Sequence, residues 1–367
     1  MLAFCQRYPF LIFLALEVSI ILLWTKAPKP DYIIPQSGQV QQFLVSRYET
    51  FGIDGAELGT LASLTLGDRA AIDKDIKKAF SASGAMHILA VSGLHTGIVW
   101  AVLWMLLTCF GRKRPLYDER VKQFALAGLI ILFLWFYAGV TGWSPSVVRS
   151  VLMVMIAQGA LLAHRSPMSV NAVAAAAFCI LLVRPMDIYS LSFQLSFAAV
   201  TAIVLFVPFF NKFVPLSHQL PSIVYMSLVY VRDLISVSLA AQIGTAPITL
   251  LYFGKFSTYF LLTNILVVPM AFLIMSGAIL FFTVGWIPII GKGIAIVLDG
   301  LAWFLNHYVS WIQSLPYAAI EFPITKMMCW VMISGIVCGA MALRDSRWAL
   351  LWLIPAIGCC VGLVVLA

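Results

Sequence analysis

Charged side chains are scarce in this chain of 367 residues. They make up 10% of it, whereas a soluble domain carries about 25%. Hydrophobic residues reach 62%, so the chain cannot cover itself with a water-soluble surface. Its apolar runs are about 18–25 residues long, the length of membrane-spanning helices, and they lack the alternation of an outer-membrane barrel. The composition therefore predicts an all-α polytopic membrane helix bundle.

Motifs for nucleotide and metal chemistry are also missing from the sequence. The stretch around Gly291 and Lys292 comes nearest to a phosphate-binding loop, but Gly293 stands where Ser or Thr is needed. The five histidines include no His-x-His or His-Glu-x-x-His pattern, and the seven cysteines have no metal-ligand spacing. We therefore expect no metal, no cofactor and no ATP hydrolysis by this chain.

Four parts follow from the distribution of polar residues. Residues 1–25 are predicted to be an anchor helix, 26–85 a polar segment with short amphipathic helices, 86–343 a transmembrane core, and 344–367 a C-terminal transmembrane helix. In the polar segment, two sets of apolar residues each share a helical face: Val40, Phe43, Leu44 and Tyr48, then Leu58, Leu61, Ala62 and Leu66. Such helices can lie in the headgroup layer or cover a cavity.

Residues 87–95 (HILAVSGLH) interrupt the first membrane segment of the core. Ser92 and Gly93 predict a break in the helix, and His87 and His95 flank it. A break in hydrocarbon is tolerated only where protein or water covers the backbone. Polar residues beside such a break are a functional-site hypothesis. The alternative is a packed helix contact, where Gly and Ser are common.

Other intramembrane polar groups point the same way. Arg149 lies about a turn inside a predicted span, where it either reaches the nearer interface or faces a hydrated interior. Residues 242–247 (QIGTAP) predict an unwound or kinked span, and residues 256–285 either one kinked helix or two half-spans. In total we expect about ten spans, some of them broken or re-entrant. The basic loop at residues 112–122 predicts a cytoplasmic side.

Two functions other than a channel fit these features. A secondary transporter for a small solute would use similar broken helices, although it would predict inverted repeats that the sequence does not display. An intramembrane serine hydrolase would use Ser92 with His95 as its base. Ser92, however, lacks the preceding glycine of a nucleophile elbow.

Six short motifs, taken together, resemble the membrane competence domain of the ComEC/Rec2 family. In chain order they are residues 67–69 (GDR), 87–95 (HILAVSGLH), 141–149 (TGWSPSVVR), 184–187 (RPMD), 192–197 (SFQLSF) and 242–247 (QIGTAP). The resemblance runs from about residue 54 to about residue 340. Longer members of that family also carry an OB-fold domain and a metallo-β-lactamase-like domain, for which this sequence offers no counterpart.

The resemblance implies a channel for the uptake of single-stranded DNA during natural transformation, in the bacterial inner (plasma) membrane, and not an enzyme. The implied partners are single-stranded DNA, the lipid bilayer, a separate DNA receptor and a DNA-translocating ATPase, with a homo-oligomer left open. A phosphodiester chain can cross hydrocarbon only through a wet and preferably cationic interior. The candidates for lining that path are Asp68, Arg69, His87, Ser92, Gly93, His95, Arg149, Arg184, Gln194, Ser196, Gln242 and Asn264.

Overall fold

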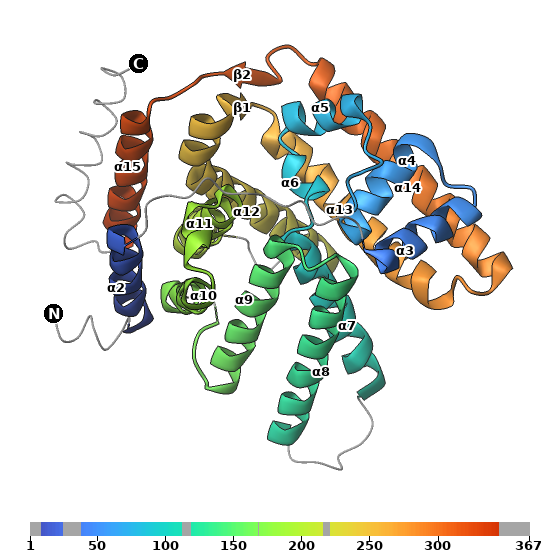
Figure 1. Cartoon of the computed structure of the whole chain (residues 1–367), viewed down its shortest axis with the longest axis horizontal. Coiled ribbons are helices and arrows are strands. Elements are labelled where there is room, and N and C mark those ends of the chain that lie inside the picture. Colours follow the sequence, from blue (N-terminus) through green and yellow to red (C-terminus); the bar gives the residue numbers. More distant parts are fainter. Residues whose placement is uncertain (1–8, 25–37, 112–118, 168, 216–220, 345–367) are drawn as a thin grey trace. The chain divides into compact units, whose positions relative to one another are not determined.

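The structure of this chain is a computed structural model (Figure 1). It describes residues 9–24, 38–111, 119–167, 169–215 and 221–344. The chain forms two compact units. Unit 1 comprises Met1–Met186 and Leu266–Pro316, and unit 2 comprises Asp187–Ile265 and Tyr317–Ala367. The polar segment and the His87–His95 motif therefore belong to unit 1.

Helices form nearly all of both units, which confirms the predicted all-α class. Unit 1 contains α2 (Pro9–Trp24), α3 (Gln39–Thr50), α4 (Gly55–Leu61), the π-helical turn η1 (Ala62–Leu66), α5 (Lys74–Ser83), α6 (Met86–Leu89), α7 (Gly93–Gly111), α8 (Glu119–Val140), α9 (Pro145–Leu162), α10 (Val170–Val183), most of α13 (Phe260–Val284) and α14 (Pro288–Ser314). Unit 2 contains α11 (Leu191–Phe213), α12 (Ser222–Phe253), β1 (Lys255–Ser257), the start of α13, β2 (Ala319–Glu321) and α15 (Lys326–Arg344). The short helix η2 (Pro185–Tyr189) lies at the boundary.

Seven helices among the described residues are long and apolar enough to cross a membrane: α8, α9, α11, α12, α13, α14 and α15. Three shorter apolar helices, in α2, α7 and α10, add to them. This chain is therefore a multi-pass membrane protein. The predicted C-terminal helix at 344–367 lies, from residue 345 onward, outside the described residues.

The polar segment folds into the short helices that its periodicity predicts. Leu58, Leu61, Ala62 and Leu66 are all buried, as their shared face requires. Gly67 closes η1 in the left-handed conformation, at φ +77°, which a residue with a Cβ atom rarely adopts. The other predicted face lies on α3 and is buried only in part. Tyr48 is buried and Leu44 packs against the core, but Val40 and Phe43 are more than half exposed.

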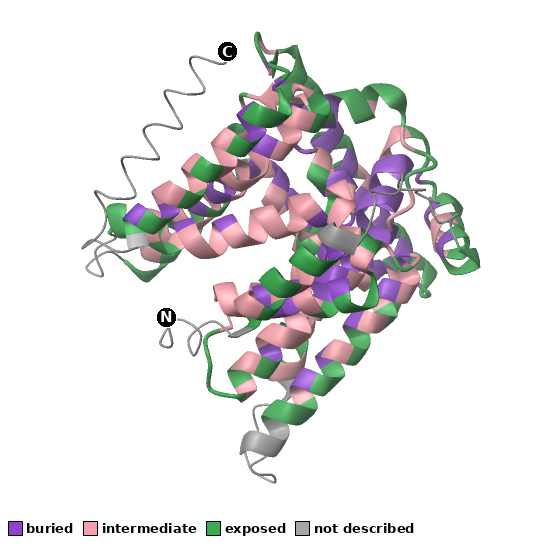
Figure 2. Cartoon of the chain, turned by 60° about the vertical axis from the view of Figure 1, so that its left-hand side comes forward, coloured by how far each residue is buried: buried purple, intermediate pink, exposed green. Residues whose placement is uncertain are grey.

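The core of unit 1 joins this segment to two membrane helices. Tyr48 stacks on Phe281 of α13, with 5.1 Å between ring centroids. Thr60 Oγ1 donates a buried hydrogen bond of 2.8 Å to Asn306 Oδ1 of α14. All five residues of η1 are buried. Figure 2 colours the buried residues of the chain purple. The polar segment is thus an integral layer of unit 1.

For two spans the structure decides between the alternatives that the sequence left open. Residues 242–247 are not unwound, because α12 is helical from Ser222 to Phe253 with Pro247 inside it. Residues 260–284 likewise form the single helix α13 with Pro269 inside, so there are no two half-spans. A proline removes one backbone donor, and membrane helices accommodate that loss when neighbouring groups satisfy the freed carbonyl.

The described part of unit 2 includes a small antiparallel sheet that the helix pattern does not predict. Strands β1 and β2 pair Lys255 with Glu321, Phe256 with Ile320 and Ser257 with Ala319. Lys255 Nζ lies 3.0 Å from Glu321 Oε1 on its exposed surface. Each strand has three residues, too few for a period-2 pattern to stand out in sequence.

Candidate functional site

The predicted break lies where the sequence places it. Helix α6 ends at Leu89, α7 begins at Gly93, and the three residues between them are not helical. Ser63 Oγ donates a buried hydrogen bond of 2.6 Å to the Leu89 carbonyl oxygen, which α6 itself leaves without a donor. The break is therefore a stable feature built by side chains of two segments.

His95 is fully buried on the α7 side of the break, with 0% of its surface exposed. Its Nδ1 accepts the backbone N–H of Ser92 at 3.1 Å and lies 3.2 Å from Ser92 Oγ. A nitrogen that accepts carries no hydrogen, so the neutral ring has its hydrogen on Nε2. Nε2 has no hydrogen-bond partner among the described residues. A general base would need the Nδ1 lone pair for the Ser92 hydroxyl proton, and the backbone N–H competes for it.

Three motifs that are far apart in the sequence meet beside the break. A Cβ atom placed on Gly67 would lie 3.1 Å from Val91 Cγ2 and 3.6 Å from the carbonyl oxygen of Thr141. Gly67 belongs to the motif at 67–69, Val91 to the motif at 87–95, and Thr141 begins the motif at 141–149. Only a glycine has the space and the positive φ for this contact. The positions of three of the six motifs are thus explained by one junction in unit 1.

The N-terminus of α7 also touches α9. A Cβ atom on Gly93 would lie 3.4 Å from Ser150 Oγ. Arg149, the residue before Ser150, is only 2% exposed and heads the set of large, fully buried side chains. The sequence left open whether Arg149 reaches an interface or faces the interior, and the structure buries it within unit 1. A cation therefore lies in the helix turn that contacts the break.

Gln41 and Thr65, which the sequence did not single out, complete this junction. Gln41 is buried: its Nε2 donates to the Leu66 carbonyl at 2.8 Å, and its Oε1 accepts the Gly38 N–H at 2.8 Å. Tyr48 Oη and Thr65 Oγ1 lie 3.2 Å apart, and burial raises the pKa of the Tyr48 phenol. From sequence, a polar residue in an amphipathic helix is expected to face solvent. Only the structure, in which Gln41 is buried, shows that it links the segments of this junction.

The remaining candidates of unit 1 lie nearer to its surface. Asp68 Oδ1 accepts the N–H of Ala70 at 2.9 Å and so shapes its own turn. Arg69 and His87 are exposed, and His87 Nδ1 lies 3.0 Å from the Gly84 carbonyl oxygen. Arg184 follows the last residue of α10 and is exposed.

Four candidates belong to unit 2. Gln194 Nε2 donates to the Ile188 carbonyl oxygen at 3.0 Å, and Ser196 and Gln242 are half-buried. Asn264 is buried, and its Nδ2 donates to Ser238 Oγ at 3.3 Å. Gln242 follows Ser238 by one helical turn and shares its face. Unit 2 therefore has a neutral polar contact between α12 and α13.

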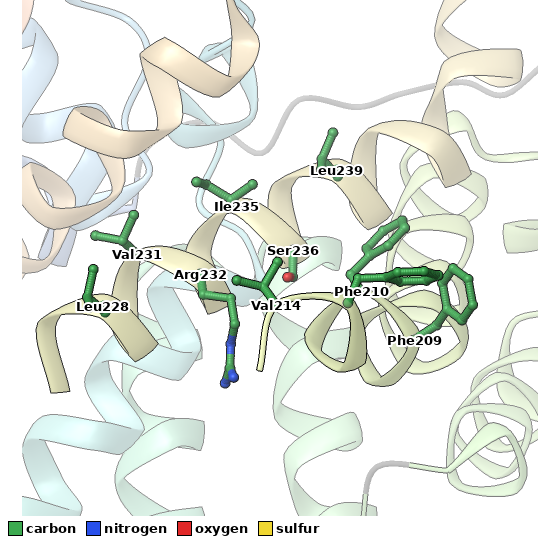
Figure 3. Close-up of a pocket in the computed structure, with 10 residues that line it drawn as sticks. Phe209, Phe210, Val214, Leu228, Val231, Arg232, Ile235, Ser236 and Leu239 are labelled. Carbon is green, nitrogen blue, oxygen red and sulfur yellow. The ribbon is translucent and has the colours of Figure 1, made fainter. Parts of the chain in front are cut away.

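Unit 2 also carries an apolar groove of about 510 Å³ between α11 and α12. Phe209 and Phe210 of α11 and Leu239 of α12 line it (Figure 3). The cation at its rim is Arg232, whose Nε and Nη2 donate to Asp233 Oδ1 at 2.9 and 2.7 Å. Because its lining is apolar and its cation is paired, this groove does not suit a polyanion.

The described residues contain no group of three His, Cys, Asp or Glu side chains that could hold a metal ion. The break offers hydrogen-bond donors and the start of α7, and the turn of α9 that contacts it carries the buried Arg149. These groups bind and orient anions.

Comparison with known proteins gives a family for this arrangement. A family model described as Competence protein matches residues 64–347. The chain is 33% identical to ComE operon protein 3 of Bacillus subtilis (strain 168) over 222 residues, which are 60% of this chain and 26% of that protein. It is 28% identical to the uncharacterized protein YcaI of Escherichia coli (strain K12) over 281 residues, 75% of this chain and 35% of that protein. The chain thus spans about a quarter to a third of the length of these relatives. No solved structure matches it.

Proposed function

This chain belongs to the competence protein family, and on that premise we propose that it forms a channel through which single-stranded DNA crosses the bacterial inner membrane during natural transformation. The partners in this proposal are the single strand, a separate DNA receptor and a DNA-translocating ATPase. The chain itself acts as a passage and not as an enzyme. Copies of it can associate around the passage as a homo-oligomer.

The convergence at the break carries this proposal. An unpaired charge in hydrocarbon costs on the order of tens of kcal/mol on an idealised estimate, so each phosphate needs polar groups along its path. In unit 1, Gly67, Val91 and Thr141 bring three separate motifs together, and Gly93 touches the turn that holds the buried Arg149. Burying a cation beside an interrupted membrane helix costs free energy. A helix bundle with a purely structural role would gain nothing from it.

Backbone groups add to this chemistry. The first amides of α7 have no acceptor within the helix, and Gly93 at its start is exposed. Amides at a helix start favour anions, as does a guanidinium. We propose that phosphates of the strand pass along this face, with Arg149 supplying the positive charge.

The test replaces Arg149 in the complete chain and measures uptake of labelled DNA. Arg149→Ala should reduce transformation about 100-fold, the factor that corresponds to losing a charged hydrogen bond of about 3 kcal/mol. The matched control is Arg165→Ala, because Arg165 is exposed in the turn after α9. Both variants should be inserted in the membrane at the parent's level. Normal transformation by Arg149→Ala, or by a strain lacking the whole gene, would overturn the proposal.

A further inference from the structure

We propose that His95 is a positioning residue, which fixes the start of α7 after Ser92 and thereby maintains the break between α6 and α7. It does so by accepting a backbone hydrogen bond. It is not a group that contacts the strand. Its importance for DNA uptake rests on the proposed function, whereas its effect on the backbone does not.

The hydrogen bonds at the start of α7 follow the arrangement of a capping box. In that arrangement the third residue after the N-cap, usually Glu or Gln, accepts the backbone N–H of the N-cap residue. Ser92 precedes the first residue of α7, and its carbonyl accepts the N–H of Thr96 at 3.2 Å. His95 is the third residue after Ser92, and its Nδ1 accepts the Ser92 N–H at 3.1 Å. His95 thus occupies the position of the Glu or Gln.

Burial explains why a histidine serves here. His95 is 0% exposed, and an ionised Glu at such a site would be a desolvated charge. A neutral imidazole offers the same acceptor without a charge. Ser92 Oγ, at 3.2 Å from the same Nδ1, adds a second contact to this cap.

The break is held from both sides. Ser63 Oγ donates to the Leu89 carbonyl at the end of α6, and His95 accepts the Ser92 N–H at the start of α7. These two bonds replace backbone partners that a continuous helix would supply. Without the acceptor on His95, this hydrogen bond from the Ser92 N–H is lost, and residues 90–92 can extend α7 at its N-terminus. The position of Gly93 beside Ser150 depends on that cap.

The test compares His95→Gln with His95→Met in the complete chain. Gln restores the capping-box acceptor, whereas Met fills a similar volume without one. The reporter is Gly93→Cys, since a Cβ atom there makes only an ordinary contact with Ser150 Oγ. The rate at which a water-soluble maleimide labels this cysteine is measured in membranes without DNA, with mass spectrometry of the peptide that contains residue 93.

We expect His95→Gln to retain the parent's labelling rate and uptake within about twofold, because Gln is a natural capping-box residue. His95→Met should change the labelling rate and lower uptake by about tenfold, in the range for a lost cap. His95→Ala is a second variant without an acceptor, so the result does not depend on Met alone.

Two results would overturn the inference: parental labelling in both Met and Ala variants, or loss of uptake in His95→Gln while its labelling stays parental. The second would mean that the imidazole itself contacts the strand. If the labelling rates change as expected but no variant, Arg149→Ala included, affects uptake, the cap stands and the proposed function fails.

Discussion

Residues 92–93 and residues 242–247 both predict an interruption or distortion of a membrane helix, yet they fold differently. Both combine a glycine with polar neighbours inside an apolar segment, and the second also has Pro247. The first separates α6 from α7, while the second lies within the continuous α12. Glycine and proline alone therefore do not decide where a membrane helix ends.

The difference lies in which groups the polar side chains bind. In α12 the hydroxyls of Thr245 and Thr249 donate to the carbonyls of Ala241 and Thr245, one turn back on the same helix. At the break, Ser63 and His95 bind backbone groups that a continuous helix would pair internally. In α12 the side chains bind carbonyls of the same helix, and the helix continues. At the break they bind the backbone groups that a continuous helix would have paired with each other, and the helix is interrupted.

The largest effect that this comparison predicts concerns the two glycines. A Cβ atom on Gly244 would lie 2.5 Å from Ala202 Cβ and 2.6 Å from the Ala198 carbonyl oxygen of α11. Gly244→Ala should therefore force α11 and α12 apart and destabilise the protein by about 1–3 kcal/mol, the usual cost of overpacking. Gly93→Ala meets only Ser150 Oγ at 3.4 Å and should cost less. Thermal unfolding in detergent measures both, and equal costs would contradict the assigned role of Gly244.

The second prediction compares two histidines of the same unit. His95→Ala removes the acceptor for the Ser92 N–H and should lower DNA uptake by about tenfold. His164→Ala should leave uptake unchanged, because His164 is exposed in the turn after α9. Equal effects on uptake, at equal amounts of inserted protein, would mean that the break is not on the path.

A smaller effect is expected at Pro247. Pro247→Ala returns a backbone donor to α12, which is already helical there. We expect the free energy of unfolding to change by no more than about 1 kcal/mol, with uptake intact. If uptake instead fell as far as in His95→Ala, the proline would have a role in the path that its continuous helix does not explain.

The smallest effect is expected from a serine-reactive probe. Because the Ser92 N–H competes for the lone pair of His95 Nδ1, Ser92 should not be an activated nucleophile. A fluorophosphonate probe should therefore label the parent no more than Ser92→Ala. Labelling that Ser92→Ala abolishes would favour the hydrolase alternative over the channel.

Sequence reasoning located the helices and the break because both depend on local patterns. Long apolar runs predict spans, and Ser92 with Gly93 predicts an interruption. The motif at residues 67–69 is visible in the sequence, but the contact of Gly67 with Val91 and Thr141 joins positions far apart in the chain. The local periodicity of a sequence cannot predict such long-range contacts.

The same limit explains the residues that were missed. Gln41 reads as one more polar residue on an amphipathic helix, and its bond to the Leu66 carbonyl appears only once α3 and η1 have packed. Conversely, Val40 and Phe43 share a predicted helical face with Tyr48, but the core covers only part of that face. A pattern predicts which residues can be buried together, and packing decides which of them are.

The length of α12 has a consequence for how the chain meets its surroundings. Its 32 residues extend about 48 Å at about 1.5 Å per residue, whereas the hydrocarbon layer is about 30 Å thick. Even a tilt of about 40°, the upper end of the usual range, leaves it longer than that layer. At least one end of α12 therefore extends beyond the hydrocarbon layer. The ion pair of Arg232 and Asp233 lies about a third of the way along α12 from its first residue. Its charges suit the boundary between the lipid tails and the headgroups.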